Sequence, residues 1–239
     1  MTTYYVPENV TQLDGSPCRS SNCWAAAGAT LLDGATGGGA TLTPTAFRAR
    51  AGGGSGSADK DNPDCRSGFE VDVEKGLDRM GVKATIIRVP RPRAAFILGT
   101  QRSAMFAVAT DYELWPKDLK AAAPTFKGNH MVTVIPGQNA DNEVRVGNPL
   151  AAGYQRINLA DLLDAAEKFA REHGRGPVIH LVRIYRPADM GAAASDLERR
   201  VAALERENES LRDALDDAHD RSVADTIALA PYNKPEDPR

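Results

Sequence analysis

A cysteine at the predicted start of a helix is the residue of this 239-residue chain best placed to do chemistry. Cys23 is followed by Trp24 and then by the small residues AAAGA, a composition typical of a closely packed helix. The partial positive charge at a helix N-terminus stabilises a thiolate and lowers the pKa of the cysteine. Because a thiolate beside an imidazole can attack a carbonyl carbon, Cys23 is a candidate nucleophile.

Two polar residues next to predicted strands could serve as the base and its orienting group. His130 opens the apolar segment HMVTVIPG, and Asn148 follows the next predicted strand, NEVRVG. Gly, Asn and Asp residues between the two strands predict a hairpin, which would return Asn148 to the side of His130. The other histidines fit this role less well, because they lie at a helix end, in mid-strand and in a C-terminal heptad segment (His173, His180, His219).

Each of these residues also has an ordinary structural interpretation, which the sequence leaves open. Cysteine is among the most buried residue types, so Cys23 can be an inert core residue. His130 can be a hydrogen-bonded strand residue, and Asn148 before a proline can be a turn residue. A metal site made of the three cysteines and His130 is disfavoured, because the chain lacks CxxC pairs and has only four histidines. We therefore expect no metal and no cofactor.

The elements that must position these residues follow an α+β pattern. Helices are expected over 22–33, 43–51, 69–81, 93–98 and 158–174, and strands over 82–89, 104–112, 130–137, 142–149 and 177–185. Gly34 is the predicted end of the first helix. Helices first and strands later favour helices packed on one side of a mostly antiparallel sheet.

The composition changes after Pro187, where a different kind of segment is predicted. Leucines recur every seven residues at Leu197, Leu204 and Leu211, with Asn208 at the alternate heptad position. This pattern predicts a coiled-coil helix through which the chain self-associates, with a helix packed on its own domain as the alternative. The predicted parts are a main domain, a linker, the coiled-coil helix and an extended tail (1–187, 188–194, 195–220 and 221–239).

Charge and hydropathy narrow the class of partner. A net charge of -3 and a pI near 5.9 argue against a nucleic-acid partner. No apolar run reaches the roughly 18–20 residues of a membrane span. The first residues, MTTYYVPENVTQ, have neither a basic nor an apolar region of a secretory signal, so we expect synthesis in the cytoplasm.

Three motifs in this order resemble the papain-like cysteine peptidases. NCWAAAGATLL is similar to the nucleophile helix of that family, and GNHMVTVIPG and NEVRVGNPL are similar to its later histidine and asparagine strands. The segment FAVATDYELWPKDLKAAAPTFKGNHMVTV resembles the branch related to bacteriocin-leader-processing peptidases, which has relatives in phage lysins and phage particles. The resemblance covers residues 1–187 and implies a papain-like fold with a Cys-His-Asn site.

The resemblance also implies roles for residues near the start of the chain. In the family, a glutamine before the cysteine donates to the developing oxyanion together with the cysteine N–H. Gln12 is the one upstream glutamine, although its spacing of eleven residues exceeds the usual one, and Asn22 is an alternative donor. A papain-type disulfide is implied between Cys18 and Cys65, whereas a reducing cytosol would keep both as thiols.

Two functions remain open at this stage. The first is a cysteine peptidase or amidase, acting on a cell-wall peptide or on a protein of the same phage particle. The second is a catalytically silent papain-like domain, used as a structural component of a phage particle and assembled through residues 195–220. A domain can keep its fold without its activity, so the decision must come from the site.

Overall fold

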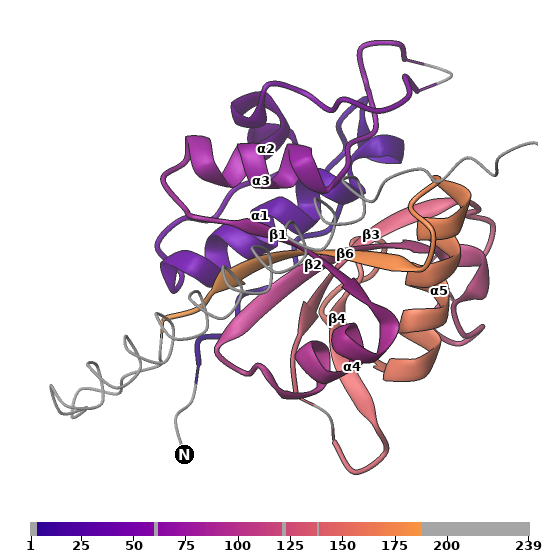
Figure 1. Cartoon of the computed structure of the whole chain (residues 1–239). Coiled ribbons are helices and arrows are strands. Elements are labelled where there is room, and N and C mark those ends of the chain that lie inside the picture. Colours follow the sequence, from indigo (N-terminus) through magenta and orange to yellow (C-terminus); the bar gives the residue numbers. More distant parts are fainter. Residues whose placement is uncertain (1–3, 60–61, 121–122, 138, 188–239) are drawn as a thin grey trace, which may run out of the picture. The chain divides into compact units, whose positions relative to one another are not determined.

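Six antiparallel strands form one sheet in the part of the chain that the structure describes (Figure 1). The computed structural model describes residues 4–59, 62–120, 123–137 and 139–187. The strand order is β1-β6-β2-β3-β4-β5, so β2 and β3 lie at the centre, and β6, the last strand in sequence, lies between β1 and β2. The strands are β1 (Thr85–Pro90), β2 (Ala104–Asp111), β3 (Asn129–Ile135), β4 (Glu143–Gly147), β5 (Tyr154–Asn158) and β6 (Val178–Tyr185).

Helices cover both faces of the sheet, as Figure 1 shows. The helices are α1 (Cys23–Thr36), α2 (Pro44–Ala51), α3 (Glu70–Arg79), α4 (Arg91–Thr100) and α5 (Leu159–Glu172). The first three pack on one face, and α4 and α5 pack on the other. The α+β class and the antiparallel sheet are confirmed, whereas the expectation that all helices share one side is wrong.

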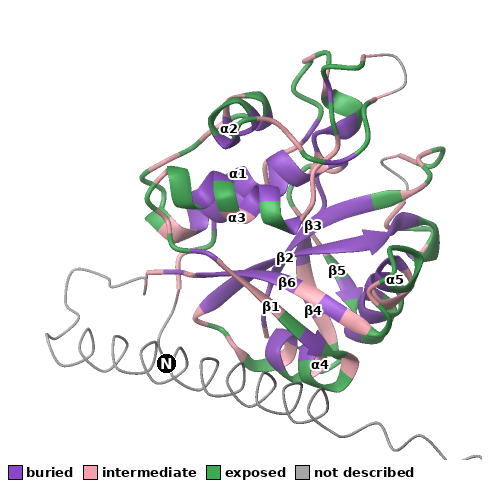
Figure 2. Ribbon diagram, turned by 45° about the horizontal axis from the view of Figure 1, so that its top comes forward, coloured by how far each residue is buried: buried purple, intermediate pink, exposed green. Residues whose placement is uncertain are grey.

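Strand β2 shows why two helical layers are needed. All eight of its residues are buried (Figure 2). Met105 and Ala107 pack with α1–α3, whereas Phe106 and Val108 pack with α4 and α5. Because successive side chains of a strand point to opposite faces, a strand that is buried throughout requires cover on both faces of the sheet.

Helix α1 continues past its predicted end at Gly34, because this glycine packs against β2 and does not terminate the helix. A Cβ at Gly34 would lie 2.7 Å from the Met105 sulfur, so the glycine lets the helix approach β2 closely. The helix ends at Thr36, and Gly37 follows in the left-handed conformation with φ 64°. Its N–H donates to the Asp33 carbonyl, which closes the last turn.

Phe47 of α2 is the residue around which the three N-terminal helices meet. Its ring is fully buried and lies against Gly28 of α1 and Gly76 of α3. A Cβ at Gly28 would come within 2.3 Å of the ring, and a Cβ at Gly76 within 2.7 Å. Both glycines therefore provide the room in which the aromatic ring sits.

Gly28→Ala should lower the free energy of unfolding by about 2 kcal/mol, because the added methyl overpacks the contact with Phe47. Chemical denaturation of the two proteins measures the difference. In a Phe47→Leu background the same substitution should cost much less, since the ring atoms in conflict are gone. An equal cost in both backgrounds would show that the ring does not cause the effect.

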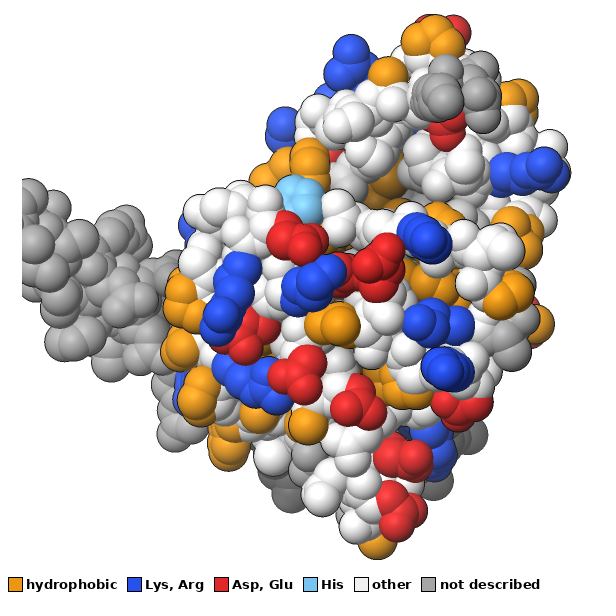
Figure 3. All heavy atoms as spheres, turned by 90° about the vertical axis from the view of Figure 1, so that its right-hand side faces the viewer, with side chains coloured by type: hydrophobic (Ala, Val, Ile, Leu, Met, Phe, Trp, Pro, Cys, Tyr) orange, Lys and Arg blue, Asp and Glu red, His pale blue; other side chains and the backbone are white. Residues whose placement is uncertain are grey.

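The outer face of α5 carries interspersed acidic and basic side chains (Figure 3). Lys168 bonds to Asp111, and Arg171 bonds to Glu167 at 2.9 Å. Arg91 of α4 bonds to Asp164, which joins the two helices on this side of the sheet. The mixed charges on this face thus hold α5 in place beside β2 and α4.

Two sequence predictions differ from the fold or lie outside it. Strand β5 was missed, because YQRIN is a short polar edge strand that is identified by its pairing with β4. The linker, the coiled-coil helix and the tail were predicted over residues 188–239, which lie outside the described residues. In the described part, no helix is long and apolar enough to span a membrane.

Candidate active site

Cys23 is the first residue of α1 and follows a single 3-10 turn, Arg19–Ser21. Asn22 occupies the N-cap position but makes no side-chain cap, because its Oδ1 accepts a hydrogen bond from Arg48 Nε at 2.6 Å. The free N–H groups of the first helical turn therefore lie beside the cysteine. This is the predicted place for the nucleophile.

The environment of the Cys23 thiol contains opposing effects. Burial raises the pKa of the thiol above its ordinary value. Hydrogen bonds from the backbone N–H groups of Met131 and Trp24, and the positive charge of Arg48, lower the pKa. Burial is the largest of these effects, so the net shift of the thiol pKa is upward, although Cys23 as a whole residue is only half-buried.

His130 lies in β3 and its ring sits in an aromatic cage. The ring centroids of Tyr112, Phe126 and Trp115 lie 5.2, 5.5 and 6.3 Å from that of the imidazole. The residue is only 1% exposed. This cage excludes water and lowers the pKa of His130 to about 4, against a smaller opposing effect of the hydrogen bond to Asn148.

Asn148 follows β4 and binds the imidazole as the hairpin prediction requires. Its Oδ1 lies 2.8 Å from His130 Nε2, and β3 pairs antiparallel with β4. The Oδ1 atom also accepts from the Leu150 N–H at 3.0 Å, and Nδ2 donates to Gln155 Oε1 at 3.0 Å. These partners fix the orientation of the amide.

The tautomer of His130 follows from this amide orientation. Because Asn148 presents an oxygen, His130 Nε2 must carry the proton and Nδ1 must be the unprotonated nitrogen. Within the described residues Nδ1 is buried and has no hydrogen-bond partner. Leaving such an atom unpaired costs about 1–3 kcal/mol, and this nitrogen remains able to accept a proton.

Cys23 and His130 line the same cleft, which encloses about 110 Å³. A preformed ion pair would need a direct hydrogen bond between the Cys23 sulfur and His130. The described residues show no such bond, because His130 Nδ1 has no partner among them. The other lining residues come from the loop before α3, from β2 and β3, and from α5 and its end (Ser57, Ser67, Gly68, Phe69, Ala109, Asn129, Met131, Phe169, His173).

His173, which the sequence analysis set aside as a helix-end residue, also lines this cleft. Its Nδ1 donates to the Phe169 carbonyl at 2.9 Å, and Asn129 Nδ2 donates to its Nε2 at 3.1 Å. Both ring nitrogens are thus occupied, which makes His173 a wall of the cleft and leaves His130 as the available base. Only the fold could have shown this, since 150 residues of chain separate His173 from Cys23.

Gln12 is buried close to the Asn148 turn but does not line the cleft. Its N–H donates to the Pro149 carbonyl at 2.8 Å, and its Nε2 donates to the Arg19 carbonyl at 2.8 Å. The alternative donor, Asn22, donates from Nδ2 to Ser16 Oγ at 3.2 Å. The structure thus brings Cys23, His130 and Asn148 together, and the role of Gln12 stays a prediction.

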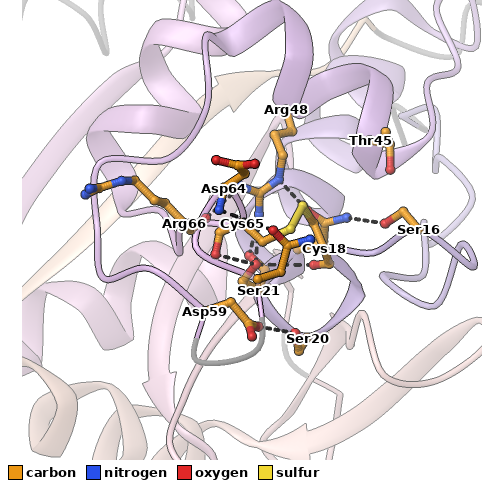
Figure 4. The surroundings of a disulfide bond; sticks show 12 residues. Ser16, Cys18, Ser20, Ser21, Thr45, Arg48, Asp59, Asp64, Cys65 and Arg66 are labelled. Atoms are coloured by element: carbon orange, nitrogen blue, oxygen red, sulfur yellow. Dashed lines mark hydrogen bonds between the residues drawn. A yellow bond between two sulfur atoms is a disulfide. The ribbon is translucent and has the colours of Figure 1, made fainter.

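A disulfide joins Cys18 to Cys65, as the family resemblance implied. It links the segment before Cys23 to the segment that leads into Ser67 and Gly68 of the cleft wall (Figure 4). Because the chain has three cysteines, Cys23 is its one free thiol. No group of three or more His, Cys, Asp or Glu residues suited to a metal occurs in the described part of the chain.

Comparisons with known proteins bear on the fold. The chain is similar to a solved structure from Bacillus anthracis described as a "putative C39-like peptidase", with a TM-score of 0.50 and 11% identity. The match covers 79% of this chain and 100% of that one. No family model and no curated protein matches the sequence. At this identity the likeness shows the fold alone, which this chain shares with that protein.

Proposed function

We propose that this protein is a cysteine peptidase or amidase that hydrolyses a peptide bond with Cys23, His130 and Asn148. The observation that carries the proposal is the tautomer of His130. Asn148 holds the proton on Nε2, so an unprotonated Nδ1 is left buried, without a partner, on a ring that lines the same cleft as the one free thiol. The papain-like fold supports the same assignment.

The electrostatics indicate when the proton moves. Burial favours a neutral thiol and a neutral imidazole, so the resting site holds no ion pair. When a peptide carbonyl enters, His130 Nδ1 takes the Cys23 proton as the sulfur attacks the carbonyl carbon. His130 then gives that proton to the leaving amine, which produces an acyl-enzyme that water hydrolyses.

The negative charge on the carbonyl oxygen needs hydrogen-bond donors. The N–H groups at the start of α1, including that of Cys23, can supply such donors, because no side chain caps this end of the helix. Gln12 can add a donor if its side chain leaves the Arg19 carbonyl when substrate binds. Gln12→Ala therefore separates the contribution of Gln12 from that of the helix N-terminus.

The proposed substrate is a peptide, either a cell-wall cross-link or a protein of a phage particle. The disulfide supports a site of action outside a reducing cytosol, because such a bond persists in oxidising surroundings. We propose self-association through residues 195–220 as the means by which the domain is held in a larger assembly.

The second candidate function is a catalytically silent domain in such an assembly. The missing sulfur–imidazole hydrogen bond and the raised thiol pKa are the observations that favour it. Catalytic hydrogen bonds are often long before substrate binds, which is why we prefer the peptidase.

The test is hydrolysis of a randomised pool of quenched fluorescent peptides, with cleavage sites read by mass spectrometry. Cys23→Ala should abolish cleavage, and His130→Ala should reduce it by about 10³-fold or more. His180→Gln is the matched control, since His180 lies in β6 and does not line the cleft. A wild type that cleaves no peptide is a silent domain, and a His130→Ala variant that cleaves as fast as the wild type overturns the role of His130.

A further inference from the structure

We propose that Arg48 is a positioning residue for the nucleophile, which fixes the turn before Cys23 and places a permanent positive charge beside the sulfur. The inference deepens the proposed function and rests on it for the role of Cys23 as nucleophile. Arg48 belongs to α2, which contributes no residue to the lining of the cleft. Its influence therefore acts through the residues that it binds and through its charge.

The guanidinium of Arg48 donates from all three of its nitrogen atoms. Nε donates to Asn22 Oδ1 at 2.6 Å, and Nη2 donates to the carbonyl and the hydroxyl of Ser21 at 2.9 and 3.2 Å. Nη1 donates to the Arg66 carbonyl at 2.7 Å. Arg48 is only 8% exposed, so these bonds are shielded from water.

These bonds reach both segments that border the nucleophile. Ser21 and Asn22 directly precede Cys23, whereas Arg66 directly precedes Ser67 and Gly68 of the cleft wall. The disulfide joins the same two segments further from the cleft, and Figure 4 shows the Arg48 side chain reaching into the region between them. Arg48 thus sets the spacing between the sulfur and the facing wall.

The positive charge of Arg48 has no ion-pair partner among the described residues. The carboxylates whose charges act on Arg48 bind other groups: Asp14 accepts from Thr45 at 2.7 Å, and Asp72 accepts from the Phe69 N–H at 2.8 Å. The guanidinium lies 5.3 Å from the ring of Trp24, the residue next to Cys23. An arginine stays charged even when buried, so this charge is present throughout the reaction.

The charge acts against the effect of burial on the thiol. Burial raises the pKa of Cys23, and the attraction between Arg48 and the thiolate lowers it. The other titratable groups facing the sulfur are His130 of β3 and His173 after α5, both of which line the cleft. The pKa of His130 is lowered to about 4, and both ring nitrogens of His173 are hydrogen-bonded, which leaves Arg48 as the fixed charge that favours the thiolate.

The experiment measures the rate at which iodoacetamide alkylates Cys23 as a function of pH. In the oxidised protein Cys23 is the one free thiol, so intact mass reports the reaction directly. Arg48→Gln should react about tenfold more slowly at pH 7 and match the wild type at high pH, since one pKa unit is a tenfold change in thiolate. Arg48→Lys keeps the charge and should stay within about threefold of the wild type at pH 7.

Arg79→Gln is the matched control. Arg79 of α3 also donates to a backbone carbonyl, that of Ala51, but its charge is not among those that act on Cys23. Its alkylation profile should match the wild type. A profile of Arg48→Gln that coincides with the wild type overturns the proposal, as does an Arg48→Lys profile as slow as that of Arg48→Gln.

Two features keep the test informative. If Arg48→Gln does not fold, Arg48→Lys still tests the positioning role through hydrolysis of the peptide pool. The lysine cannot make the several hydrogen bonds of the guanidinium, so kcat should fall at least tenfold while the pH dependence of Cys23 alkylation stays the same. An unchanged kcat overturns the positioning role. The alkylation readout needs no substrate. If His130→Ala has no effect on hydrolysis, the proposed function is overturned. The effect of Arg48 on the pKa of the Cys23 thiol is then still measured by alkylation.

Discussion

Replacing Cys18 and Cys65 together by alanine should lower the free energy of unfolding by about 4 kcal/mol. The disulfide closes a loop of 47 residues, and a link across a loop of this length restricts the unfolded chain by about that amount. Cys65 is buried, so the variant also loses some packing. Denaturant unfolding of the oxidised wild type and of the double variant measures the difference.

Reduction provides the control for this prediction. A reductant should destabilise the wild type by a similar amount and should leave the double variant unchanged, because that variant has no disulfide to lose. A double variant as stable as the oxidised wild type would contradict the prediction. The substitution should also reduce hydrolysis, because the disulfide holds the segment that leads to Ser67 and Gly68 of the cleft wall.

The sequence predicts the fold well where one periodicity dominates. The amphipathic pattern of 158–174 and the apolar strand 104–112 correspond to α5 and β2 within three residues at each end. It fails where tertiary contacts decide. Gly34 is a typical helix terminator, yet its contact with Met105 makes it a packing residue. Strand β5 is too polar and short to be recognised without its partner.

The candidate site shows the same division. Chain order and hairpin spacing are enough to place Asn148 beside His130. The aromatic cage is not predictable, because Trp115 and Phe126 lie in loops whose course the fold determines. Arg48 was missed for a different reason: a charged residue on a short helix is normally solvated, and only the buried contacts identify it.

The stability of the protein should fall by about 2.5 kcal/mol between pH 7.5 and pH 4.5 because of His130 alone. Its pKa is depressed from about 6.5 in the unfolded chain to about 4 in the native state. Between these pH values the unfolded chain binds a proton at His130 that the folded protein does not. The contribution of His130 to stability is therefore fully present above pH 6.5 and is lost as the pH falls toward 4. Denaturant unfolding at several pH values measures the loss.

The contribution of His130 is isolated by comparing variants. His130→Gln should lose less stability than the wild type over this range, by about the same 2.5 kcal/mol. His180→Gln should remove a smaller part, because His180 is only half-buried although its pKa is also lowered. Equal pH slopes for the wild type and His130→Gln would show that the native imidazole titrates near its ordinary pKa.

The same depressed pKa sets the acid limit of the proposed reaction. His130 accepts the Cys23 proton only when Nδ1 is unprotonated, so hydrolysis should persist through mildly acidic pH and fall as the pH drops through about 4. A preformed thiolate–imidazolium pair also loses activity in acid, when its thiolate is protonated, but it adds a decline as the pH rises past the pKa of the imidazolium. The alkaline limb of the kcat/KM profile therefore distinguishes attack by a resting thiolate from general-base attack, which the raised pKa of Cys23 and the lowered pKa of His130 favour.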